Sequence, residues 1–409
     1  MGKSTHFIGQ PMYNQVIKLL DRSKILEISR ERGGERYIKR FDCWVHLVVM
    51  LYAVIKRFDS LSEITAALLA EARKLCHLGI SIKTSKSTLA DANKRRSETI
   101  FEGIYRYLYA RYHHELSSDS RSGKTPKWMK RLQIVDSTTI TLFSNLIFKG
   151  VGRHPKTGRK KGGIKVHAVI HANEGVPSDI KFTSAATNDS FMLRPGNLSK
   201  GDILAMDRAY IDYDKMEELS RRGVTYVTKM KKRLRNVLWE DIIWQNPQGL
   251  MEVRIQHVTF IKEQRDGSYT RHHARVITCV DENKRRLVSL LTNDMDSDPA
   301  EIIEIYHKRW EIELLFKQIK QNFPLKYFYG ESANAIKIQI WVTLIANLLL
   351  MVMKSRLTRK WSFSGLATMM RINLMYYVDF YSLFNNPEKD WETILENASG
   401  SPPHPSLFD

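Results

Sequence analysis

The sequence predicts an α/β protein in which helical regions flank a mixed sheet with helices. Apolar residues recur at helical spacing through roughly the first 130 positions. Strand and helix patterns alternate over 132–229, and 233–297 is again rich in strand patterns. Helical patterns return from 299 to 385. A chain of 409 residues is long enough for several structural units.

The N-terminal region, residues 1–125, is expected to be a basic helical domain. Residues 1–130 contain 24 Lys and Arg against 13 Asp and Glu, within a net charge of +20 for the whole chain. Such an excess favours a polyanionic partner, and helices suit insertion into a DNA groove. We therefore interpret this region as DNA-binding, with Arg95 and Arg96 as candidate contacts. A helical bundle with a solvated basic face is the alternative.

Residues 126–232 are expected to form the first part of a sheet domain. The segment Ser117–Lys130 has the composition of a linker and precedes it. A β-β-β-α-β-α-β succession follows, with strands expected over Leu132–Phe143, Gly163–His171, Val176–Phe182, Asp202–Asp207 and Val224–Lys229, and helices over Asn188–Leu198 and Tyr213–Arg222.

Three further segments complete the expected organisation. Residues 233–297 are predicted to be a β-rich insertion, and 298–330 to return to the sheet domain as a helix. Residues 331–409 are predicted to be a helical region with a Pro-containing tail. The apolar run Ile340–Met353 is short for a membrane span and suits a core helix. We expect a cytoplasmic protein without a membrane partner.

Two aspartates stand where apolar strands end. Asp136 and Asp207 follow the runs LQIV and ILAM, and a buried carboxylate is costly unless it is paired or binds a cation. Taken singly, Asp136 could be a turn or cap residue, and Asp207 could pair with Arg208. Neighbouring strands would instead bring the two acids together. We expect metal ions, rather than nearby Lys or Arg, to be their partners.

A third acid is available on the helix expected over 299–321. Tyr306, Arg309, Glu313 and Lys320 follow one another at steps of three, four and seven residues, which places them on one helical face. A face with these four polar side chains is unsuited to an apolar core, so we interpret it as part of a functional site. A salt-bridged face exposed to solvent is the alternative interpretation. Three carboxylates at one point would provide the hard oxygen ligands that Mg²⁺ prefers.

With this signature, Asp136, Asp207 and Glu313 resemble the catalytic residues of the DDE transposases of bacterial insertion sequences, in the IS-four branch. The resemblance covers nearly the whole chain. It implies an RNase H-like core with a mixed five-stranded sheet. It also implies that Asp136, Asp207 and Glu313 are catalytic and hold two Mg²⁺ ions, for which Mn²⁺ substitutes.

The resemblance also implies a reaction and partners. The protein would bind the terminal inverted repeats of its own element and cleave the DNA through a hairpin intermediate. It would then join the 3′-OH ends to target DNA by two-metal phosphoryl transfer, acting on double-stranded DNA as a homodimer. An RNase H-like nuclease or resolvase that only hydrolyses, and a non-catalytic DNA-binding regulator, are the alternatives.

Further residues are candidates for DNA contact. Tyr306, Arg309 and Lys320 are expected to bind phosphates near the scissile bond. Trp239 and Trp244 are candidates for stacking a flipped base, with packing in a small β domain as the alternative. Basic clusters are expected to follow the DNA backbone. Their candidate residues are Arg159, Lys160, Lys161, Lys229, Lys231, Lys232 and Arg233.

Overall fold

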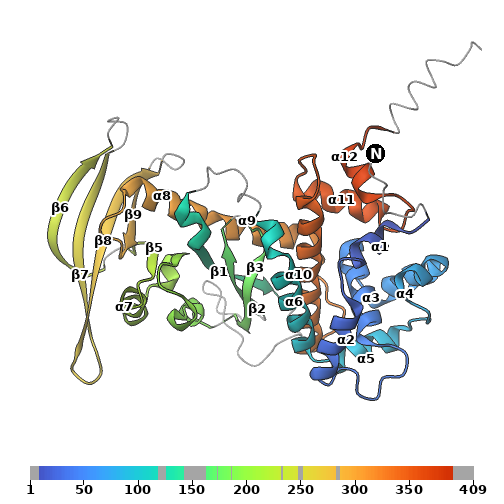
Figure 1. Cartoon of the computed structure of the whole chain (residues 1–409). Helices are drawn as coiled ribbons and strands as arrows, with labels where there is room; N and C mark the ends of the chain where they lie inside the picture. Colours follow the sequence, from blue (N-terminus) through green and yellow to red (C-terminus); the bar gives the residue numbers. More distant parts are fainter. Residues whose placement is uncertain are drawn as a thin grey trace, which may run out of the picture. The chain divides into compact units, whose positions relative to one another are not determined.

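The computed structural model divides the chain into two compact units (Figure 1). One comprises Met1–Leu108, Asn322–Gly330 and Asn334–Asp409, and is here called the helical unit. The other, the sheet unit, comprises Tyr109–Gln321 and Glu331–Ala333. The residues that the structure describes are 9–117, 126–141, 163–172, 174–185, 187–231, 234–246, 252–281 and 286–389.

The helical unit combines segments from both ends of the chain around two apolar helices. Nearly every residue of α3 (Cys43–Lys56) and α10 (Ala333–Ser355) is buried, as expected for helices that are apolar on all sides. Among the described helices, α10 alone is long and apolar enough to cross a membrane, but 89% of its most apolar stretch is buried within the protein. The remaining helices of the unit are α1 (Met12–Ile17), α2 (Arg22–Glu31), α4 (Leu61–Ala70), η1 (Ala72–Leu78), α5 (Lys86–Arg95), the first half of α6 (Glu98–Leu116), α11 (Phe363–Asn373) and α12 (Phe380–Asn385).

A large mixed sheet forms the centre of the sheet unit, in agreement with the predicted α/β class. Its strand order is β3-β2-β1-β4-β5-β9-β8-β7-β6. The parallel pairs are β1 with β4 and β4 with β5, and the other neighbours are antiparallel. The strands are β1 (Leu132–Thr141), β2 (Gly163–His171), β3 (Pro177–Ser184), β4 (Ile203–Met206), β5 (Thr225–Lys229), β6 (Val237–Gln245), β7 (Glu252–Glu263), β8 (Tyr269–Asp281) and β9 (Arg286–Thr292).

The strands expected to form an insertion belong to this same sheet. β9 pairs with β5 through Val227 and Thr292, so β6 to β9 extend the five strands β1 to β5 instead of forming a separate sheet. Local strand patterns could not anticipate this pairing, because it joins segments more than 60 residues apart in sequence.

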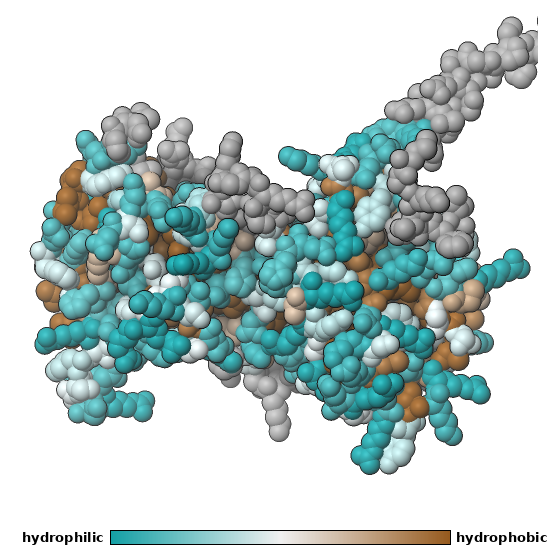
Figure 2. Space-filling view, in the orientation of Figure 1, coloured by the Kyte–Doolittle hydropathy of each residue, from teal (hydrophilic) through white to brown (hydrophobic). Residues whose placement is uncertain are grey.

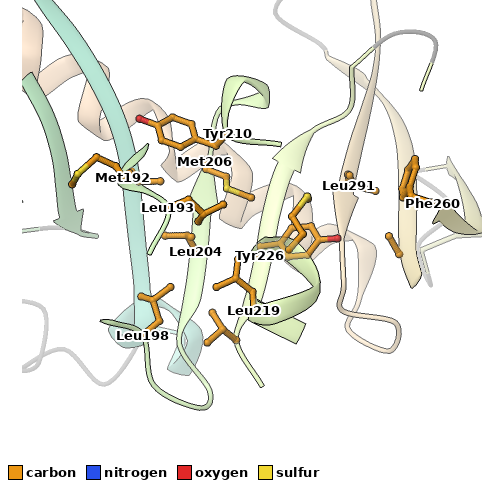
Figure 3. Packing of buried hydrophobic residues seen from close by; sticks show 14 of the residues in the cluster. Met192, Leu193, Leu198, Leu204, Met206, Tyr210, Leu219, Tyr226, Phe260 and Leu291 are labelled. Atoms are coloured by element: carbon orange, nitrogen blue, oxygen red, sulfur yellow. The ribbon is translucent and has the colours of Figure 1, made fainter. Parts of the chain in front are cut away.

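Helices pack against the sheet, and this packing shows which strand side chains lie on the face that α7 covers. Helix α7 (Tyr213–Arg221) contributes Met216 and Leu219 to an apolar cluster that also contains Val135 and Met206 (Figure 3). Helix α8 (Pro299–Lys308) contacts β4, β5 and β9, and α9 (Trp310–Asn322) follows it. Because side chains alternate along a strand, Asp136 points to the face opposite to that of Val135.

The segment 188–198 differs from its prediction as one helix. It forms two short 3₁₀ helices, η4 (Asp189–Met192) and η5 (Pro195–Asn197). Proline cannot donate a backbone hydrogen bond within a helix, and Gly196 follows Pro195, so a continuous α-helix is disfavoured here. Within the described residues, the sheet unit also contains the 3₁₀ turns η3 (Lys127–Arg131) and η6 (Arg208–Tyr210).

Candidate active site

The structure brings Asp136 and Asp207 together on neighbouring parallel strands. Val135 of β1 lies opposite Met206 of β4 in parallel register, so the residues that follow them are also neighbours. Asp136 lies within β1 and is therefore not a turn residue. Asp207 precedes η6 without capping it, and among the described residues its carboxylate has neither a hydrogen-bond nor an ion-pair partner. The pairing with Arg208 considered above is thus absent.

Arg309 connects two of the three acids. Its backbone remains helical between α8 and α9, so the helical path continues from Tyr306 to Glu313. The Arg309 guanidinium lies 2.6 Å from Glu313 Oε1 and 3.8 Å from Asp136 Oδ2, and it stacks 5.5 Å from the centre of the Tyr306 ring. The Arg309 side chain is only 12% exposed. Arg309 therefore pairs with Asp136 and Glu313 in this structure, and metal ions as the partners of these acids stay a prediction.

Lys320, which is about three helical turns after Arg309, also contacts strand β1. Its ammonium group donates to Thr138 Oγ1 at 2.6 Å and to the Thr139 carbonyl at 3.1 Å. The ammonium group of Lys320 is therefore held against β1, two and three residues beyond Asp136. Arg309 and Lys320 thus both connect the signature helix to β1.

The pKa of Asp136 is raised mainly by burial and, to a smaller extent, by its two acidic neighbours. Burial is the main cause that raises this pKa from 3.8 to about 6, and the charges of Asp207 and Glu313 raise it further. The Ser137 backbone N–H and the Arg309 guanidinium oppose the increase. Burial also raises the pKa of Tyr306, with smaller contributions from Asp207 and Glu313.

Asp136, Asp207 and Glu313 have the right ligand chemistry for divalent cations, but their side chains are not arranged as a metal site in this structure. Among the described residues, no three His, Cys, Asp or Glu side chains are grouped closely enough to hold a metal. Carboxylates are nevertheless the hard oxygen ligands that Mg²⁺ prefers, and both Asp207 and Glu313 are close enough to Asp136 to affect its pKa. For metal binding, Arg309 would have to release Asp136 and Glu313, to which it is now bound.

The two candidate tryptophans lie on β6, the last strand of the sheet. Figure 2 shows apolar side chains among polar ones in the part of the surface that carries β6, and exposed residues of β6 include Val237, Ile243 and Trp239. The Trp239 side chain is 56% exposed and contacts the ring edges of His257 and His273. Trp244 is half-buried opposite Val253.

The basic candidates fall into three groups. The first group lies at the end of β5: Lys229 is the last residue of this strand, and Lys231 is two residues further along the chain. Exposed Arg95 forms an ion pair with Asp91, whereas Arg96 is 4% exposed and donates to the Phe41 carbonyl, so Arg96 supports the packing of the helical unit. The remaining candidates, Arg159, Lys160, Lys161, Lys232 and Arg233, lie outside the described residues.

Several polar residues near Asp136 escaped sequence reasoning. Asp189 accepts hydrogen bonds from Ser137 and Lys165, and the hydroxyl of Tyr210 is buried nearby. Burial raises the pKa of Tyr210, and the charges of Asp136 and Asp189 raise it further. Asp189 neither ends an apolar run nor belongs to a spaced signature. The only sequence cue was the position of Tyr210 just after Asp207.

Comparison with known proteins defines the class to which this fold and site belong. Residues 127–349, more than half of the chain, match the family described as "Transposase DDE domain". The chain therefore belongs to the DDE transposase family. Residues 8–81 separately match a family described as "Domain of unknown function (DUF4372)".

Individual relatives agree with this assignment. The protein y4zB of Sinorhizobium fredii, named as a transposase, is 27% identical over 66% of this chain and 72% of its own length. A transposase for the insertion sequence element IS5377 of Geobacillus stearothermophilus is 24% identical over 55% of this chain and 57% of its own length. A transposase for the element IS4SA of Synechocystis is 25% identical over 64% and 70%, respectively. The predicted relationship to bacterial insertion-sequence transposases is thus confirmed.

Proposed function

We propose that this protein cleaves the ends of its own insertion sequence and joins them to target DNA at a site formed by Asp136, Asp207 and Glu313. The main support is threefold: Asp136 and Asp207 follow paired residues of the parallel strands β1 and β4, Arg309 contacts both Asp136 and Glu313, and the chain belongs to the DDE transposase family. The order β3-β2-β1-β4-β5, with β2 antiparallel to β1, supports an RNase H-like core.

Each signature residue then has a role that follows from its position. Asp136, Asp207 and Glu313 would hold two Mg²⁺ ions, or Mn²⁺ in their place, which stabilise the attacking and leaving oxygens of phosphoryl transfer when bound. Arg309 would exchange its carboxylate partners for a DNA phosphate, whose oxygens can also accept two hydrogen bonds from one guanidinium. Lys320 would hold a neighbouring phosphate, and Tyr306 supports the guanidinium through its ring.

The remaining proposals concern the DNA and its binding partners. Arg95, Lys229 and Lys231, together with the candidates outside the described residues, would contact the DNA backbone of the terminal repeats and the target. Trp239 or Trp244 would stack a base that leaves the helix if cleavage proceeds through a hairpin. We further propose a cytoplasmic location and assembly of two copies on the DNA.

The test uses the full-length protein and a labelled duplex that carries the inverted repeat flanking its gene. With Mg²⁺ we expect a nick that frees the 3′-OH, followed by products in which this end is joined to a second DNA, and neither with EDTA. Hydrolysis without joined products would favour a nuclease or resolvase. Specific binding without any cleavage would favour a DNA-binding regulator, and either result would overturn the proposal.

A further inference from the structure

Asp189 joins three parts of the sheet unit at a point next to the candidate active site. It is the first residue of η4, and its Oδ1 accepts a hydrogen bond from Ser137 Oγ of β1 at 2.5 Å. The same oxygen accepts from Lys165 Nζ of β2 at 3.1 Å. Lys165 also donates to the Thr187 carbonyl at 2.7 Å, so the ammonium group is held from two directions. Both charged side chains are largely shielded from water, with 24% of Asp189 and 13% of Lys165 exposed.

Ser137 links this cluster to Asp136. Its backbone N–H donates to Asp136 Oδ1 at 2.7 Å, while its hydroxyl donates to Asp189. One residue therefore binds two carboxylates, one through its backbone and the other through its side chain. Ser137 is held in β1 by its pairing with β2, and the bond to Asp189 adds a side-chain restraint on the residue whose N–H binds Asp136.

We propose that Asp189 is a positioning residue for Asp136, that it acts through Ser137, and that Lys165 keeps Asp189 in place for this role. The inference rests on the proposed function of Asp136 as a metal ligand. Groups that hydrogen-bond to a metal ligand fix its orientation, and their loss typically weakens metal binding by about 10–100-fold. Asp189 has no need to touch metal or DNA to have this effect.

The experiment measures the dissociation constant for Mn²⁺ of the full-length protein, from the electron paramagnetic resonance signal of free Mn²⁺. We expect Asp189→Ala and Ser137→Ala each to weaken Mn²⁺ binding by about tenfold. The double variant should be no weaker than either single variant, since both interrupt one path. Asp189→Asn should retain most of the affinity, because its amide oxygen can still accept from both Ser137 and Lys165.

Asp202→Ala is the matched control. Asp202 is also a half-buried aspartate that holds β1, through the Gln133 amide at 3.3 Å, but it does so near the strand's other end. Its loss should lower thermal stability without changing Mn²⁺ affinity. If Asp189→Ala does not fold, Ser137→Ala and Asp189→Asn decide the question.

Unchanged Mn²⁺ affinity in folded Asp189→Ala, or additive effects of the two alanine variants, would overturn the inference. Asp136→Ala separates this result from a failure of the proposed function. If that variant loses Mn²⁺ binding while Asp189→Ala does not, only the positioning role is wrong. If wild-type protein binds no Mn²⁺, or Asp136→Ala binds it normally, the proposed metal site is itself wrong and the inference falls with it.

Discussion

The guanidinium of Arg309 lies 3.8 Å from the carboxylate of Asp136, and this ion pair links the helices α8 and α9 to strand β1 of the central sheet. The same guanidinium lies 2.6 Å from Glu313. A single cation thus bridges two of the three acids that we propose to be catalytic. Its replacement should therefore affect both the charge balance and the chemistry of the site.

Arg309→Lys is expected to reduce DNA cleavage about as strongly as Arg309→Ala. Lysine keeps the charge but has no planar fork with which to bind a carboxylate or phosphate through two hydrogen bonds. We expect both variants to cleave at least about tenfold more slowly than wild type, which corresponds to roughly 1.4 kcal/mol. Single-turnover cleavage of an end-containing duplex measures this. Near-normal cleavage by the lysine variant would show that only the charge matters.

The pKa of Asp136 predicts how stability depends on pH. Since the pKa is raised from 3.8 to about 6 in the folded protein, the native state binds more protons than the unfolded state between these values. Stability should therefore fall as pH rises from about 4 to 6, by roughly 2–3 kcal/mol for this group, and then level off.

Asp136→Asn isolates this effect, because asparagine does not titrate. The difference in unfolding free energy between the variant and wild type, measured in urea with EDTA, should shift in favour of the variant over the same pH range. A difference that does not vary with pH would contradict the raised pKa of Asp136.

Tyr210→Phe tests the buried hydroxyl near the acids. Tyr210 is fully buried, and among the described residues its hydroxyl makes no hydrogen bond of normal geometry, although Ser137 lies close enough to lower the pKa of Tyr210 slightly. Figure 3 shows Tyr210 at one end of the apolar cluster. A buried hydroxyl without a partner costs about 1–3 kcal/mol, so the phenylalanine variant should be more stable by up to this amount. Urea unfolding measures the change. A loss of stability would show that the hydroxyl is bonded in solution, for example to water.

Lys320→Ala should weaken DNA binding in a way that depends on salt. Loss of one phosphate contact should reduce the slope of log affinity against log salt concentration by about one. Fluorescence anisotropy between low and moderate salt provides the slope. Lys200→Ala is the control, since exposed Lys200 precedes β4 while Asp207 follows it. Equal slopes for both variants would exclude a specific role for Lys320.

The two tryptophans of β6 should differ in their effects. Trp239 is exposed, so Trp239→Ala should change stability little, whereas Trp244→Ala should destabilise the half-buried face of β6. If Trp239 stacks an unpaired base, its loss should cost about 1–3 kcal/mol of binding to that base. Fluorescence of 2-aminopurine placed at the cleaved end reports stacking. If Trp239→Ala leaves the 2-aminopurine fluorescence unchanged, Trp239 does not stack the unpaired base.

The sequence provides signals for the acids of the candidate site but few for the residues that surround them. Asp136 and Asp207 could be found because each follows a short apolar run, and parallel pairing of β1 with β4 then makes them neighbours. Glu313 could be found because helical spacing links it to Arg309 and Lys320. These signals are local, and in the structure Arg309 contacts both Asp136 and Glu313 while Lys320 contacts β1.

Features that depend on distant contacts could not be predicted. The ion pair of Arg309 with Asp136 and the position of Asp189 beside Ser137 both join segments far apart in sequence. Pairing of β5 with β9 made one nine-stranded sheet from what local patterns divided into a core and an insertion. Likewise, helices from both ends of the chain share one unit, because α3 and α10 are apolar on all sides and need a common core.

The most direct test of the proposed site compares Asp136→Asn, Asp207→Asn and Glu313→Gln in nicking of an end-containing duplex with Mg²⁺, while specific binding is measured on the same DNA. These substitutions remove one carboxylate charge each with little change in size. We predict that all three lose nicking by about a hundredfold or more, since direct ligands should matter at least as much as their hydrogen-bonding partners. Specific binding should remain within a few-fold of wild type. Wild-type nicking by any one of the three would contradict the assignment of that acid to the active site.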